Sequence, residues 1–172
     1  MKTIILNSTP LIYLTKIGLA NLLRELRLQK FTSSLVKKEV VEKGKAAGAP
    51  EAPLLEDLFQ SGAIKLKEPR NKKLIERLHE VKGLSEADIR VLALARECDA
   101  TAIVDDAMAG KTAKTFGIAY AGTPYLLSRA FLQGLISRQE TRKAVDDMIS
   151  AGWRCGIEDY QRIIKQIDAL SP

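Results

Sequence analysis

Short apolar runs that alternate with segments of helical periodicity are the feature that most constrains how this chain can fold. The runs lie at residues 3–6, 30–32, 63–66, 102–104 and 118–121. A short run that ends at capping or turn residues is typical of a buried strand. Parallel strands need a long crossover between them, and here each crossover has a helical pattern. The order therefore predicts a parallel sheet with helices on both faces.

The helical segments are bounded by recognisable capping and breaking residues. Asn7 or Ser8 is suited to cap the first helix, with Pro10 in its first turn. Ser85 with Asp88 three residues later is a variant of the capping box. A further helix is expected to begin at Ser33 or Ser34 and to end at Gly44. Other helices are expected over residues 53–60, 71–81, 84–95 and 109–116, and over most of the chain from Pro124 onward. Residues 43–50 are the most loop-like segment.

Composition bounds the class of protein. A chain of 172 residues with 46% hydrophobic and 28% charged residues is expected to fold as one domain, residues 1–172, with a helical extension over about 124–172. Cys98, Cys155 and the single His79 have no zinc-ligand spacing, and the thiols suit a reduced, cytoplasmic protein. No apolar run is long enough for a signal peptide or a membrane span. The net charge of +6 weakly favours a polyanionic partner.

Polar side chains follow two of the predicted strands. Asn7 follows the first strand, Asp105 and Asp106 follow a later one, and Glu39 and Asp88 fall in the first turns of helices. Sites in open parallel sheets form outside the carboxyl ends of the strands, so these side chains are expected to converge. Carboxylates held close together need cations, and Mg²⁺ or Mn²⁺ prefers oxygen ligands and substrate phosphates. This chemistry points to phosphodiester hydrolysis.

Each residue also has a simpler interpretation. An acid in the first turn of a helix complements the helix dipole, so Asp88, Asp105 and Asp106 fit a capping role. Glu39 fits a solvated position beside neighbouring lysines. Lys111 and Lys114 suit a phosphate contact, but such lysines are more often a solvated helix face. Only the joint placement of the acids, in this chain order, favours a site.

Four segments together resemble the PIN-domain superfamily. Residues 5–12 (ILNSTPLI) resemble its opening strand and first motif, and residues 36–40 (VKKEV) resemble the segment with its second acid. Residues 84–95 and 103–106 are similar to the segments with its third and fourth acids. Residues 122–123, 134–136 and 151–154 resemble the C-terminal pattern of an uncharacterised, VapC-like prokaryotic subgroup. The resemblance covers nearly the whole chain, and it implies a three-layer α/β/α fold with a mostly parallel sheet of about five strands and extra C-terminal helices.

The resemblance also implies roles for individual residues. Glu39, Asp88 and Asp106 would hold Mg²⁺ or Mn²⁺, with Asp105 as a further ligand and the Thr9 hydroxyl orienting the first-motif side chain or a water. The chain departs from the family at Asn7, where the first acid is usually aspartate. An amide oxygen can ligate a metal but brings no charge, so metal affinity should fall. Val104 likewise replaces a common threonine.

The activity that the resemblance implies is metal-dependent cleavage of RNA. Many members are toxins of type II toxin–antitoxin pairs, so an RNA substrate, an antitoxin partner and a homodimer are expected. Asn7 motivates an alternative, a catalytically weakened fold that binds RNA or a protein without cutting. A structure-specific DNA nuclease is a third hypothesis.

Overall fold

A five-stranded parallel sheet forms the centre of the molecule in the computed structural model, which describes residues 1–171. Its strands are β1 (Thr3–Leu6), β2 (Gln29–Thr32), β3 (Lys65–Leu66), β4 (Thr101–Ile103) and β5 (Tyr120–Ala121), in the order β3-β2-β1-β4-β5. In β1, Ile5 pairs with Phe31 of β2 on one side and with Ala102 of β4 on the other. The central position of β1 explains why Ile4, Ile5 and Leu6 are all apolar.

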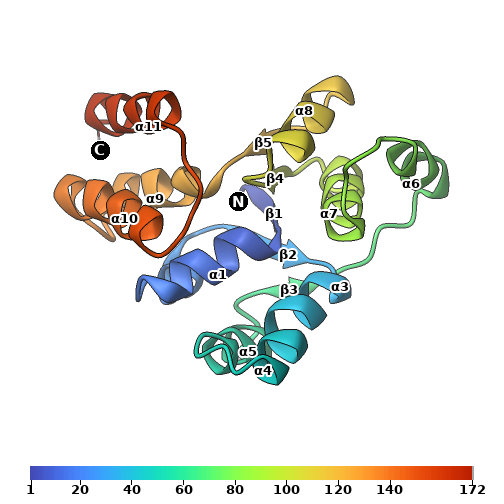
Figure 1. Ribbon diagram of the computed structural model, residues 1–172, viewed down its shortest axis with the longest axis horizontal. Coiled ribbons are helices and arrows are strands. Elements are labelled where there is room, and N and C mark those ends of the chain that lie inside the picture. Colours follow the sequence, from blue (N-terminus) through green and yellow to red (C-terminus); the bar gives the residue numbers. More distant parts are fainter. Residues whose placement is uncertain (172) are drawn as a thin grey trace.

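Helices connect all consecutive strands and cover the sheet. They are α1 (Ser8–Lys16), α2 (Leu22–Glu25), α3 (Ser34–Lys37), the π-helix η1 (Lys38–Lys43), α4 (Gly44–Ala46), α5 (Ala52–Gln60), α6 (Lys72–His79), α7 (Glu86–Glu97) and α8 (Ala107–Thr115). After β5 come α9 (Thr123–Leu132), α10 (Arg138–Ser150) and α11 (Ile157–Ala169). Figure 1 shows α9, α10 and α11 at one side of the molecule and α6 and α7 at the other, with the sheet between them. The predicted three-layer arrangement is confirmed.

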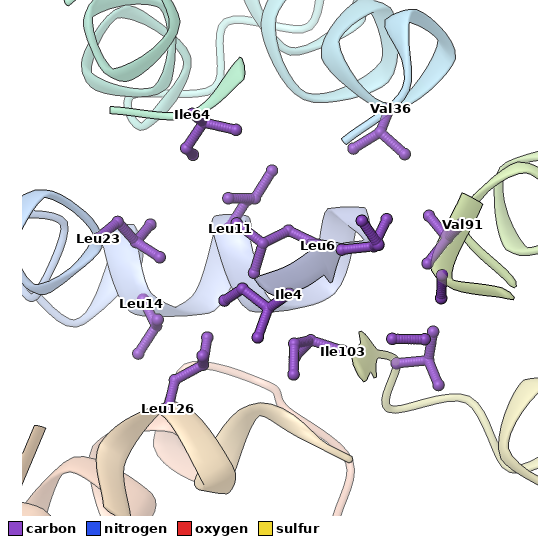
Figure 2. Close-up of a cluster of buried hydrophobic side chains, with 14 of the residues drawn as sticks. Ile4, Leu6, Leu11, Leu14, Leu23, Val36, Ile64, Val91, Ile103 and Leu126 are labelled. Atoms are coloured by element: carbon purple, nitrogen blue, oxygen red, sulfur yellow. The ribbon is translucent and has the colours of Figure 1, made fainter. Parts of the chain in front are cut away.

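The buried side chains of β1 tie the sheet to helices from distant parts of the chain. Ile4, Ile5 and Leu6 are at most 1% exposed. In the close-up of Figure 2, Ile4 and Leu6 are surrounded by apolar side chains of other elements, namely Leu11, Leu14, Val36, Val91, Ile103 and Leu126. Each fully buried side chain of this size stabilises the fold by about 1.5–3 kcal/mol. The strand ends that carry the candidate residues are therefore held rigidly.

The segment after β2 departs from the expected pattern. A helix from Ser33 or Ser34 was expected to end at Gly44, with a loop over residues 43–50. Ser33 does cap α3, but the helix then widens into η1 and continues to Ala46. Gly44 keeps a helical conformation, and the chain reverses only at Gly48, whose φ of +71° suits glycine.

The remaining expected elements are present with small shifts. Helix ends differ from the predicted ones by up to two residues. The edge strands β3 and β5 are two residues long, half the predicted length, because each pairs on one side only. The helices expected after Pro124 are α9, α10 and α11. Arg138 of α10 donates to the carbonyls of Ile167, Asp168 and Leu170, which fastens the end of α11 to α10.

Candidate functional site

The carboxyl ends of β1 and β4 lie side by side, where the strand order changes direction. The backbone N–H of Asn7 donates to the carbonyl of Ile103 at 3.2 Å, so the ladder continues to the last residue of β4. Asn7 therefore lies next to the segment that carries Asp105 and Asp106. Crevices at such a switch point are the usual ligand sites of open parallel sheets.

Asn7 uses both ends of its amide. Its Oδ1 accepts from the backbone N–H of Ser8 at 2.8 Å, which makes Asn7 the N-cap of α1. Its Nδ2 donates to Oδ1 of Asp88 at 2.7 Å, across 81 positions of sequence. Both side chains are buried, with 9% of Asn7 and 6% of Asp88 exposed. A flipped amide would place two oxygens against each other, so these contacts determine its orientation.

Asp88 is held from two directions at the start of α7. Its Oδ2 accepts from the backbone N–H and the hydroxyl of Ser85, at 3.1 and 2.7 Å, and its own N–H donates to the Ser85 hydroxyl at 3.1 Å. The predicted capping box is thus confirmed. The capping role does not exclude a site role, because the other oxygen of Asp88 faces Asn7.

Glu39 projects from the π-helix η1 and is an exposed residue. Its Oε2 accepts from the hydroxyl of Ser8 at 2.8 Å. Single turns of π-helix are rare and occur frequently at functional sites, where they redirect a side chain. Ser8 was expected only as a cap, yet it is the hydroxyl that contacts an acid. The role predicted for Thr9, a half-buried residue of α1, remains a prediction.

Asp105 and Asp106 point in different directions although they are neighbours. Asp106 is exposed and caps α8, with its Oδ1 accepting from the backbone N–H of Ala109 at 2.9 Å. Asp105 accepts from the backbone N–H of Thr123 at 2.7 Å and from its hydroxyl at 2.5 Å. Burial raises the pKa of the Asp105 carboxyl above its usual value, although these hydrogen bonds oppose the shift. Asp105 thus faces α9 rather than the Asn7–Asp88 pair.

The chemistry of the donor set suits a hard divalent cation. Asn7, Glu39, Asp88 and Asp106 offer only oxygen ligands, which Mg²⁺ and Mn²⁺ prefer. Within residues 1–171, no three His, Cys, Asp or Glu side chains stand close enough together to form a metal cluster.

One hydrogen bond joins two of the predicted site residues, Asn7 and Asp88. A second joins the predicted residue Glu39 to Ser8, which was expected only as a cap. The predicted phosphate contacts Lys111 and Lys114 are exposed on α8, the helix that Asp106 caps.

A family model described as a PIN domain matches residues 3–169, which is almost the whole chain. No curated protein matches it. Within the described part of the chain, no helix has the length and apolar character needed to cross a membrane.

Proposed function

This chain belongs to the PIN-domain family, and we propose that it is a metal-dependent endoribonuclease that hydrolyses RNA phosphodiester bonds. PIN domains are in general nucleases. The observation that carries the proposal is the pair of hydrogen bonds from the Asn7-Ser8 corner, one to Asp88 and one to Glu39. They join residues from three separate segments at the edge of the sheet where ligand sites form.

The proposed metal is Mg²⁺ or Mn²⁺, held by the oxygens of Asn7, Glu39, Asp88 and Asp106, with Asp105 as a further predicted ligand. When bound, such an ion supplies positive charge that stabilises the phosphoryl group and the leaving oxygen.

The protein's own contribution is orientation. Ser85 and Asn7 hold Asp88 in one rotamer, Ser8 directs Glu39, and the start of α8 fixes Asp106. Lys111 and Lys114 are the proposed contacts to flanking phosphates.

Cleavage of a panel of single-stranded and structured RNAs in Mn²⁺ tests the proposal. Glu39→Gln is the sharpest variant, because Glu39 is exposed and its loss should leave the fold intact. We expect this variant to lower the cleavage rate more than about 100-fold. Mutation of residues that only hydrogen-bond to metal ligands already lowers activity by about 10–100-fold. Asp88→Asn should act similarly, with circular dichroism to check the α7 cap.

Asp147→Asn is the matched control, because it neutralises a half-buried carboxyl of α10, far from the candidate site in sequence, that pairs with Lys143. Equal cleavage by the native protein and Glu39→Gln would assign the activity to a contaminant or another site. Flap and single-stranded DNA in parallel reactions separate a ribonuclease from a DNA nuclease.

The bond between Asn7 and Asp88 favours a second candidate, a weakened fold that binds RNA or a protein without cutting. Asn7 and Asp88 contact each other without a cation between them, because the Asn7 amide donates a hydrogen bond to Asp88. An acid at position 7 would instead add a second negative charge. Calorimetry with Mn²⁺ separates the candidates. Retained RNA binding without metal binding at millimolar concentrations would support the binding module.

We propose further that the protein is the toxin of a type II toxin–antitoxin pair and acts as a homodimer in the cytoplasm. Induced expression is expected to arrest growth, Glu39→Gln is expected to be harmless, and a neighbouring gene that encodes a small protein is expected to restore growth. Light scattering measures the oligomeric state. Growth arrest that persists in Glu39→Gln would contradict the toxin role.

A further inference from the structure

A cavity adjoins the candidate site on the α9 side of Asp106. It has a volume of about 840 Å³, within the range of about 300–1,000 Å³ that is usual for small-ligand sites. Its walls come from the ends of β4 and β5, from α9, from the turn before α11 and from α11. Asp105 and Ala107, the two chain neighbours of Asp106, both line it. The cavity therefore lies directly beside Asp106, a proposed metal ligand.

The indole of Trp153 forms part of the cavity wall. Trp153 is 7% exposed, and its indole Nε1 makes no hydrogen bond of normal geometry within the described chain. The indole nevertheless lies close enough to Asp105 to act on the pKa of that carboxyl. The carboxyl of Asp105, which also lines the cavity, is a hydrogen-bond acceptor.

The other lining residues are aromatic and cationic. Tyr120 is 43% exposed and Tyr125 is half-buried, so both offer ring surface to the cavity. Arg154 is exposed, and Arg162 adds a second guanidinium that is paired with Asp159. Rings for stacking, an acceptor for a base edge and arginines for phosphate are among the groups by which proteins bind unpaired RNA bases.

We infer that this cavity receives one nucleotide of a single-stranded RNA, with its base between the aromatic side chains and its phosphate toward Arg154. This inference rests on the proposed function, because it makes the cavity a subsite for the nucleotide next to the scissile bond. The net charge of +6 suits a polyanionic occupant.

Trp153 provides the assay, because it is the only tryptophan in the chain. The four nucleoside monophosphates are titrated in EDTA while its fluorescence is recorded, with ribose 5-phosphate as the probe that lacks a base. We expect saturable quenching by at least one nucleotide below about 1 mM and none by ribose 5-phosphate. A trinucleotide RNA should bind more tightly than the best mononucleotide, which distinguishes an RNA subsite from a site for free nucleotides.

Two variants test the location of the site. Tyr120→Ala should weaken binding of the tightest-binding nucleotide at least about fivefold, which is the smallest effect usual for loss of a stacking side chain. Arg154→Ala should also weaken it, whereas Lys165→Ala removes the same charge from α11 outside the cavity and should not.

The possible failures are distinguishable. If nucleotides bind but no RNA is cut, the ribonuclease proposal fails and the cavity stands as a nucleotide site. If RNA is cut by a Glu39-dependent activity but no nucleotide changes the fluorescence, the cavity proposal is overturned. Quenching by ribose 5-phosphate equal to that by nucleotides, or binding unaffected by Tyr120→Ala and Arg154→Ala, would also overturn it.

Discussion

Replacement of Asn7 by aspartate is expected to destabilise the metal-free protein and to strengthen its binding of Mn²⁺. In the native chain, Nδ2 of Asn7 lies 2.7 Å from Oδ1 of Asp88, and both side chains are buried. The substitution exchanges the N–H donor for an oxygen, so two carboxyl groups face each other. Two full charges at this separation repel by about 6 kcal/mol at an effective dielectric constant of about 20.

Protonation limits the cost of this repulsion. A new carboxyl that keeps its proton can donate to Asp88 as the amide does. Keeping a proton on a group with an ordinary pKa of about 3.9 costs about 4 kcal/mol at pH 7 and about 1.5 kcal/mol at pH 5. The folded-state pKa of the new carboxyl is thus raised, and the stability linked to its proton is lost as the pH rises. We expect a melting temperature lower by about 8–16 °C at pH 7.

Thermal unfolding followed by circular dichroism at pH 5 and pH 7 measures this effect, first in EDTA and then in Mn²⁺. The deficit should shrink at pH 5, and it should shrink in Mn²⁺ because a ligand that binds only the folded state stabilises it. Asn21→Asp is the matched control, since Asn21 is an exposed N-cap whose side chain makes no capping bond. An Asn7→Asp variant that melts like this control at pH 7 in EDTA would refute the reasoning.

Three further outcomes are expected. Ser8→Ala should lower the RNA cleavage rate about tenfold with little change in melting temperature, because Glu39 loses the hydroxyl that directs it; single-turnover kinetics measure this. Gly122→Ala should lower the unfolding free energy by about 1–3 kcal/mol in urea titrations, since its new Cβ would lie 2.9 Å from Oδ1 of Asp105. Asp105→Asn should remove a pH-dependent contribution to the free energy of unfolding. Because burial raises the pKa of Asp105, its stabilisation is complete below its unfolded pKa and declines as the pH rises through the folded pKa. Urea titrations of both proteins between pH 4 and pH 8 should therefore show the native protein losing stability relative to the variant.

Most of the fold could be predicted because its strong signals are local. Ile4, Ile5 and Leu6 are apolar because β1 is central and these three residues are buried. Ser85 and Asp88 form their capping box within three residues, so sequence spacing alone was sufficient. The weakest predictions were the edge strands β3 and β5, whose lengths depend on a single neighbour.

The geometry of the candidate site was less accessible, because it depends on side-chain direction. The π-helix that carries Glu39 has no distinctive residue pattern, and its extra residue per turn changes which side chains face the sheet. The contact from Ser8 follows from that change. Asp105 and Asp106 look equivalent in sequence, but only Asp105 meets Thr123, a residue that lies 18 positions further along the chain.

The neutral residue at position 7 separates the organisation of the site from its charge. An aspartate beside Asp88 would need a cation or a proton before the two could approach, so metal binding and ordering would occur together. Asn7 removes that requirement, since its amide bonds Asp88 and caps α1 without either. The cost is a site with one negative charge fewer and a weaker attraction for Mg²⁺ or Mn²⁺. An RNA phosphate meets correspondingly less repulsion when no metal is bound. The asparagine at position 7 therefore favours association of RNA before the metal binds. We expect this chain to differ most from PIN domains with an aspartate at this position in the order in which RNA and Mn²⁺ bind.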